Sequence, residues 1–375
     1  MTRVALAAAL SLPLATAAEP MKPGEFWYRI DDKAGKPQGY TRMVVTAVDG
    51  GGTRVEWEMK FAWTGGNYEE TRAAEFDKDR RLVSASGGRF GVTLGEGKRD
   101  GAKFVGRTRG DADAAWKDGA VEMKDPSMSE LGFALAATMP LKLGETFAYE
   151  QVSEMDSLQL RQTTLTCEAE EVVEGIKSWR FTRKYKDDKG PGVRIWVSDD
   201  RRMVKADWNG IVQTISASST KDLYKPKPPA FAETKASTKE WLELEGVIPA
   251  APEVVFDWWT KGELLTKWWP PEASVELKEG GKYELTWKAQ KWTLQGTVKS
   301  FERGKSFVFT WRWNFDAPEI ATQEVHVAFA AEGKGTKLVI RHGPYKDTPD
   351  DQGGRKGHIR GWNQFGGRLV EEIVK

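Results

Sequence analysis

The chain has 375 residues, more than the ~100–200 residues of most compact domains, so its length predicts two domains. Lys and Arg number 56 and Asp and Glu number 55, which leaves a formal net charge of only +1. A chain with so little net charge has no long-range field that attracts nucleic acid, and we expect no nucleic-acid partner. Its 17 Trp, 16 Phe and 8 Tyr supply apolar area for two cores without disulfide bonds.

Residues 1–17 have the pattern of a secretory signal peptide. Arg3 precedes an apolar run over 4–15, and Ala15-Thr16-Ala17 provides the small residues of a cleavage site. The run is shorter than the ~20 residues that span a bilayer, and no later segment reaches that length. We expect an exported protein, periplasmic or extracellular, that is soluble after cleavage and has no integral membrane segment. An apolar cytosolic amino terminus is the alternative.

The only cysteine, Cys167, lies in an alternating segment typical of a strand. One cysteine forms neither an internal disulfide nor a Cys-X-X-Cys pair, and no histidine precedes His326 to activate the thiol. We therefore expect a buried structural thiol.

Residues 20–224 are predicted to form a mostly antiparallel β domain, because apolar residues alternate with period two between Gly- and Asp-rich turns. One helix interrupts the strands. Asp125-Pro126 supplies a cap and a first-turn proline, and Ser127 and Glu130 have capping-box spacing. Pro140 limits the far end. The clearest alternating segments are 26–30, 40–45, 55–61 and 193–197.

The layout of this β domain has two further features. Residues 141–147 follow the predicted helix, and a strand near the end of the domain leads into residues 197–205. In this layout residues 26–219 resemble the incomplete-barrel domains of bacterial envelope proteins, of which the lipoprotein-carrier-like families are the nearest. The resemblance implies a curved sheet with one helix, an open barrel whose inner face holds acyl chains. A sandwich core without a ligand is the alternative interpretation.

Residues 225–237 are predicted to be a linker. Pro226, Pro228 and Pro229 lie in a Lys-rich stretch that has no apolar periodicity. The prolines favour extended polyproline geometry, so we expect a semi-rigid spacer between the domains.

Residues 238–375 are predicted to form an α+β domain. A strand over 241–248 is followed by an apolar helical pair that ends at Pro270 and Pro271. Strands then follow one another without interruption, and a helix over 358–374 ends the chain.

One face of these strands is almost wholly apolar, because side chains alternate across a strand. On the last helix Ile359, Trp362, Leu369 and Ile373 recur at three- and four-residue spacing, so we expect this stripe to cover that face. Sheet and helix are then expected to enclose an apolar pocket. Its predicted ligand-binding residues are Trp268, Tyr283, Trp287, Phe309, Trp311, Trp313, Ile340, His342, His358, Trp362 and Phe365.

Gly366 and Gly367 also lie in this helix, where each costs about 1 kcal/mol relative to Ala. Two interpretations stay open. The glycines allow close packing on the sheet, which is the commoner use of a core glycine, or they leave volume for a ligand.

Several short motifs of this domain belong together. They are Trp268-Trp269-Pro270-Pro271, Glu279-Gly280-Gly281, Gly296-Thr297-Val298 and His358-Ile359-Arg360-Gly361-Trp362. With them, residues 240–374 resemble the Hsp90-ATPase-activator-homologue-like branch of the START and birch-pollen-allergen-like (SRPBCC) superfamily, which has the helix-grip fold. The resemblance implies a hydrophobic or amphipathic ligand between sheet and helix, and some subfamilies are hydrolases or cyclases. An exported protein, however, would not meet a cytosolic ATP-driven chaperone.

The three histidines all lie in this domain. His326 alternates onto the solvent face, whereas His342 and His358 are expected at the pocket mouth. They are either core imidazoles or an acid–base pair, and the first interpretation is favoured because no Ser, Asp or Glu has triad spacing with them. Asp347, Asp350 and Asp351 are interpreted as a solvated turn, so we expect no metal site and no cofactor.

These observations favour an exported, non-catalytic binder or carrier of a hydrophobic small molecule or lipid. A hydrolase or cyclase that uses His342 and His358 is one alternative. An envelope scaffold without a ligand is the other.

Overall fold

The computed structural model describes residues 21–63, 66–155, 157–188, 190–316 and 318–375. The chain divides into two compact units. The amino-terminal unit comprises Met1–Ala62 and Tyr68–Lys225, and the carboxy-terminal unit comprises Trp63–Asn67 and Pro226–Lys375. The expected signal peptide, 1–17, lies outside the described residues. Within the described ranges, no helix combines the length and the hydropathy that crossing a bilayer requires.

The amino-terminal unit is one large sheet with a short helix against it. In the described residues the strand order is β8-β7-β6-β5-β4-β3-β2-β1-β15-β14-β13-β12-β11-β10-β9. Neighbouring strands pair antiparallel except β9 and β10, which pair parallel. The strands are β1 (Gly24–Asp31), β2 (Pro37–Val48), β3 (Gly52–Trp63), β4 (Gly66–Phe76), β5 (Leu82–Arg89), β6 (Val92–Asp100), β7 (Lys103–Thr108), β8 (Lys117–Glu122), β9 (Ser127–Met128), β10 (Thr146–Ser153), β11 (Gln159–Val173), β12 (Ile176–Tyr185), β13 (Val193–Ser198), β14 (Met203–Asp207) and β15 (Val212–Ser216).

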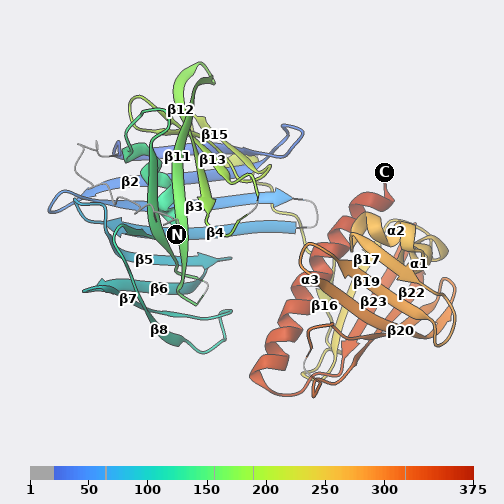
Figure 1. Ribbon diagram of the computed structural model, residues 1–375. Coiled ribbons are helices and arrows are strands. Elements are labelled where there is room, and N and C mark those ends of the chain that lie inside the picture. The colour runs from blue at the N-terminus through green and yellow to red at the C-terminus, as the bar shows by residue number, and fades with distance from the viewer. Residues whose placement is uncertain (1–20, 64–65, 156, 189, 317) are drawn as a thin grey trace, which may run out of the picture. The chain divides into compact units, whose positions relative to one another are not determined.

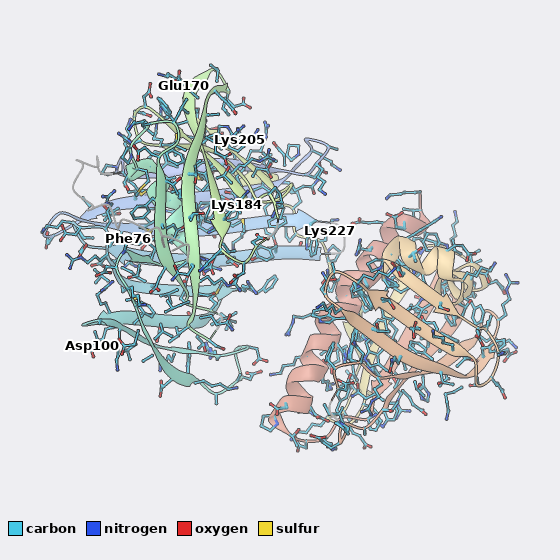
Figure 2. The ribbon with its side chains drawn as sticks, viewed as in Figure 1. Phe76, Asp100, Glu170, Lys184, Lys205 and Lys227 are labelled. Atoms are coloured by element: carbon cyan, nitrogen blue, oxygen red, sulfur yellow. The ribbon has the colours of Figure 1, made fainter. Side chains whose placement is uncertain are left out.

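This sheet is curved so that its two halves face each other across one core. Figure 1 shows β2 to β4 running across the direction of β11 and β13. Figure 2 marks Glu170 and Lys184 on the long β11–β12 hairpin. The predicted class, a mostly antiparallel β domain with one helix, is confirmed.

The helix of this unit is the 3-10 helix η1 (Glu130–Thr138). Its Phe133 packs edge-on against Trp57 and Trp208, with ring centroids 5.1 Å and 4.8 Å apart, so side chains of η1 occupy the inner face of the sheet. The predicted Ser127–Glu130 cap is wrong. Ser127 lies in β9, and Ser129 caps the helix by accepting a hydrogen bond from the Leu131 amide at 3.1 Å. A second 3-10 helix, η2 (Lys221–Leu223), ends the unit.

The carboxy-terminal unit has the helix-grip order expected from the sequence. In the described residues β17 is followed by α1 and α2, then by β18 to β23, and finally by α3. Its sheet has the order β16-β17-β23-β22-β21-β20-β19-β18. The elements are β16 (Ala232–Glu233), β17 (Leu242–Ile248), α1 (Pro252–Thr260), α2 (Gly262–Trp268), β18 (Glu272–Val275), β19 (Lys282–Trp287), β20 (Trp292–Glu302), β21 (Ser306–Trp311), β22 (Gln323–Glu332), β23 (Gly335–Gly343) and α3 (Pro349–Ile373).

The alternating apolar residues of this sheet form its buried face. On β21, Phe307 and Phe309 are fully buried, and on β23, which lies on the other side of β22, Leu338 and Ile340 are fully buried as well. Trp362 of α3 closes the core from the helix side. Figure 1 shows α3, in red, lying along this sheet.

Helix α3 begins earlier than the predicted residue 358. Thr348 is the N-cap and accepts a hydrogen bond from the Asp351 amide at 3.3 Å, and Pro349 is the first helical residue. Asp350 and Asp351 therefore lie in the first turn, where the helix dipole favours carboxylates, rather than in a free loop. The sequence prediction missed this turn because the glycines that follow, among them Gly353, interrupt the apolar pattern.

Part of the segment 225–237 packs into the carboxy-terminal unit. Phe231 is buried, its amide donates to Asn363 Oδ1 at 2.8 Å, and β16 pairs with β17. A Cβ built on Gly366 would stand 2.1 Å from Cε2 of Phe231. Of the two interpretations of Gly366, close packing is the one that the structure supports, and the neighbour is Phe231 rather than the sheet.

Replacing Gly366 by Ala is expected to lower the free energy of unfolding by about 1–3 kcal/mol, because the buried ring of Phe231 must move. Gly361 provides a matched control on the same helix. Its added Cβ would meet nothing within 4 Å, so Gly361→Ala should raise the free energy of unfolding by up to about 1 kcal/mol through helix propensity. Urea unfolding of the full chain measures both changes, and effects of the same sign would contradict this account.

Candidate functional site

Four tryptophans pack against one another between the sheet and α3. Trp362 of α3 lies with its ring centroid 5.6 Å from Trp259, 5.0 Å from Trp269 and 5.5 Å from Trp311. Trp269 and Trp311 stack on each other at 5.7 Å. We call these four residues the aromatic stack. Its rings occupy the space in which the sequence predicts a pocket.

Backbone carbonyls of α1 help to hold the stack in place. Trp259 is on the buried side of α1, and its carbonyl accepts a hydrogen bond from the Tyr283 hydroxyl at 3.2 Å. Trp268 Nε1 donates to the carbonyl of Trp258 at 3.0 Å. Trp269 follows the last residue of α2, just before the two prolines, and its ring packs on that of Trp268 at 5.3 Å.

Two histidines adjoin the stack and contact each other, with ring centroids 4.2 Å apart. His342 lies on β23, is fully buried, and accepts a hydrogen bond at Nδ1 from Trp362 Nε1 at 3.2 Å. His358 lies on α3, and its Nδ1 is 2.8 Å from the Tyr345 hydroxyl. Both imidazoles also contact Trp311, at 4.9 Å and 5.3 Å. The pair therefore joins the sheet to the helix.

Burial keeps these groups uncharged. It lowers the pKa of His342 well below 6.5, and the neighbouring His358 adds to the effect. Burial likewise lowers the pKa of His358 to about 4, and it raises the pKa of the Tyr345 hydroxyl above its ordinary value. At neutral pH both imidazoles are neutral and Tyr345 is protonated.

Three buried nitrogen atoms at this site have no hydrogen-bond partner among the described residues. They are His342 Nε2, Trp311 Nε1 and Trp259 Nε1. Leaving a buried polar group unpaired typically costs about 1–3 kcal/mol, so such groups are rare in an ordinary core. Three of them within one aromatic cluster mark this region as the candidate site.

The structure brings together six of the predicted ligand-binding residues. They are Trp268, Trp311, His342, His358, Trp362 and Phe365, the last with its ring 6.0 Å from Trp269. Tyr283 and Phe309 pack on each other at 4.3 Å and are buried in the core, as is Ile340.

Trp287 and Trp313 are only partly buried and lie farther along the sheet. They pack on each other at 5.6 Å, and Trp313 stacks on Phe315, which is 59% exposed. Trp313 also lies beyond the end of β21. His326 lies on the opposite face beside Glu324, as expected.

Sequence reasoning left Trp259, Trp269 and Tyr345 out of the predicted ligand-binding set. Trp259 and Trp269 stand out in the sequence as members of tryptophan pairs. The helical pattern around them, however, does not predict the direction in which their rings point. Tyr345 lies beyond β23, where its amide donates to the Glu240 carbonyl at 2.8 Å. An aromatic residue three positions after His342 was the only available signal.

The chemistry of this site is that of neutral nitrogen donors in an apolar surrounding. In the described residues, neither imidazole is hydrogen-bonded to a carboxylate. Nor do any three His, Cys, Asp or Glu side chains of those residues form a group that could hold a metal ion. Ligand pockets are usually lined by apolar and aromatic side chains with a few polar groups, and this site has the same composition. Such a site suits an apolar molecule that carries a polar group.

Residues 249–373 match the family model described as activator of Hsp90 ATPase homolog 1-like protein. The predicted resemblance of 240–374 to this family is confirmed. This region therefore has a fold of the START-like, SRPBCC type, which is associated with ligand binding. A search of curated proteins finds no match. The resemblance of 26–219 to lipoprotein-carrier-like domains stays a prediction.

Solved structures similar to this chain include a protein from Mesorhizobium loti, with 20% identity and a TM-score of 0.33 over 36% of this chain and 96% of that one. A Chromobacterium violaceum protein has 21% identity and a TM-score of 0.32, covering 37% of this chain and 99% of that one. A Plasmodium falciparum protein described as an HSP90 activator has 24% identity and a TM-score of 0.30, covering 36% and 96%.

The free energy of unfolding is expected to fall as the pH is lowered from about 6.5 toward about 4. His358 has a lowered pKa in the folded chain, so its contribution to stability is complete above 6.5 and is lost as the unfolded chain takes up the proton first. Each of the two histidines adds a slope of at most ~1.4 kcal/mol per pH unit in this window.

Urea unfolding at a series of pH values tests this expectation. His358→Gln should show a shallower decline than the natural chain between pH 6.5 and 4. An identical decline in the variant and the natural chain would refute the assignment.

Proposed function

We propose that the carboxy-terminal unit binds a hydrophobic small molecule or lipid between its sheet and α3, and that the protein is an exported, non-catalytic binder or carrier. The observation that carries this proposal is His342 Nε2, a fully buried polar atom without a partner in the described residues, set among aromatic rings. A ligand with an apolar body and one polar group would satisfy it. The match of 249–373 to a family with a ligand-binding type of fold supports the same conclusion.

The ligand enters by displacing rings of the aromatic stack, because these rings touch one another in the structure. Glycines are concentrated in the part of α3 that lies beside the aromatic stack. The first half of this helix contains Gly353, Gly354, Gly357 and Gly361, and a Cβ at the first, second or fourth would meet nothing within 4 Å. These three glycines therefore lower the stability of the helix, by about 1 kcal/mol each, without a packing reason in the described residues.

Binding is favoured over catalysis by the state of the histidines. A general base works best with a pKa near the ambient pH, whereas burial holds the pKa of His358 at about 4 and that of His342 also well below 6.5. Neither imidazole has a carboxylate hydrogen bond in the described residues that would counteract this. A hydrolase or cyclase role for the pair is therefore the weaker candidate.

Export is supported by the sequence of 1–17, with its apolar run and small-residue cleavage site. Amino-terminal sequencing of the protein from its own host should begin at Ala18. A mature chain that begins at Met1 would contradict export, and would make a cytosolic partner such as a chaperone worth testing.

Native mass spectrometry of the full chain from its own host is expected to show a bound hydrophobic mass that denaturation releases. The purified protein, stripped of that mass, should bind the uncharged dye Nile red in a saturable manner. Gly361→Ala stiffens α3 and is expected to weaken dye binding several-fold although it stabilises the fold. Gly110→Ala, in the amino-terminal unit, serves as the control because the added Cβ would meet nothing within 4 Å, and it should leave dye binding unchanged. Absence of both the bound mass and saturable dye binding would refute the proposal.

A further inference from the structure

The hydrogen bond between Trp362 and His342 determines which nitrogen of His342 carries the proton. An indole N–H only donates, so His342 Nδ1, 3.2 Å from Trp362 Nε1, must be the unprotonated acceptor. The imidazole is neutral, because it is fully buried. Its single proton is therefore on Nε2, which is a donor without an acceptor in the described residues.

Trp311 supplies a second donor of the same kind next to the first. Its ring centroid is 4.9 Å from that of His342, and its Nε1 is buried without a partner in the described residues. Trp259 Nε1 is a third unpaired donor and belongs to the same stack through its contact with Trp362. Among the described residues of the carboxy-terminal unit, the buried side-chain nitrogen and oxygen atoms without a partner are thus all N–H donors.

We infer that the ligand carries an oxygen group that only accepts hydrogen bonds, a carboxylate or a carbonyl, and that this oxygen binds to His342 Nε2–H and Trp311 Nε1–H. The inference rests on the proposed function, since it names the class of ligand that this same site selects. A carboxylate or carbonyl oxygen has two lone pairs and can accept from two N–H donors. A ligand with an ammonium head brings further donors and leaves the site's own N–H groups unpaired, so the site rejects it.

The arrangement selects by chemistry rather than by size, because the walls are aromatic rings that accept any apolar body. A plain hydrocarbon fits the walls but leaves the donors unpaired. An acid or an ester of the same length pairs them. A site that hydrogen-bonds a ligand group discriminates against an analogue that lacks the group much more strongly than a pocket discriminates by one methylene.

Four ten-carbon probes test the inference: decanoic acid, methyl decanoate, decylamine and decane, each competing with Nile red for the full chain. The acid or the ester should bind about 10- to 100-fold more tightly than decane and decylamine. The acid and ester results also separate a carboxylate ligand from a carbonyl ligand. Equal or tighter binding of decane or decylamine would overturn the inference while leaving the proposed function intact. Failure of all four probes and of Nile red to bind would overturn the proposed function.

Variants of His342 and Trp311 test whether their N–H groups cause the preference for the oxygen-bearing probes. Trp311→Phe and His342→Phe remove an N–H but keep an aromatic ring, and each should reduce the preference for the oxygen-bearing probe about tenfold or more. His342→Gln keeps a side-chain donor and should retain part of the preference, which separates the hydrogen bond from a loss of packing. If His342→Phe fails to fold, Trp311→Phe and His342→Gln still decide the question.

His326→Phe, on the outer face of the sheet, provides the matched control and should leave all four affinities unchanged. An unaltered preference in both Trp311→Phe and His342→Gln, together with an unaltered preference in any folded His342→Phe, would contradict the assignment of the two donors.

Discussion

The hydrogen bond from Trp362 Nε1 to His342 Nδ1 is the interaction on which the carboxy-terminal unit depends. Apolar contacts between sheet and helix have no preferred direction, so they do not by themselves fix the rotation of α3. Hydrogen bonds do, because donor and acceptor must align, and this one joins the middle of α3 to β23. It places the Trp362 ring against Trp259 and Trp269. Because Nδ1 is the acceptor of this bond, the proton of His342 is on Nε2.

The unpaired donors and the unpacked glycines of α3 lower the stability of this part of the carboxy-terminal unit. Each unpaired donor costs about 1–3 kcal/mol and each unpacked glycine of α3 about 1 kcal/mol, and these are large amounts against the 5–15 kcal/mol that separates folded from unfolded states. The costs are concentrated in one half of one helix and in the core beneath it. Gly366, in the other half, is packed against Phe231. The glycines thus lower the intrinsic stability of α3 near His358 and Trp362, where hydrogen bonds to Tyr345 and His342 attach the helix.

The sequence predicted the fold of this unit because its strands alternate strictly. Leu338, Ile340 and His342 follow one another on one face, and the structure places them there. Contacts between elements were harder to predict from the sequence. Apolar periodicity predicts which face of a helix or strand is buried, but it does not predict how the element is rotated or which residues it contacts. Phe231 lies outside the apolar pattern and still fills the space beside Gly366. In the amino-terminal unit, Ser127 had the spacing of a cap, but its hydrogen bonds go to Asp125 and Arg99 instead.

A neutral imidazole whose one acceptor nitrogen is already occupied cannot remove a proton from a ligand. His342 accepts from Trp362, so it has only the Nε2 proton left to offer, and burial opposes any second proton. What it can do is polarise or hold an oxygen, together with Trp311 Nε1–H beside it. The geometry that leaves His342 without a free acceptor nitrogen is therefore the geometry that leaves its Nε2–H as a donor. The proposed selectivity for an acceptor rests on this hydrogen-bond direction, which the fold imposes.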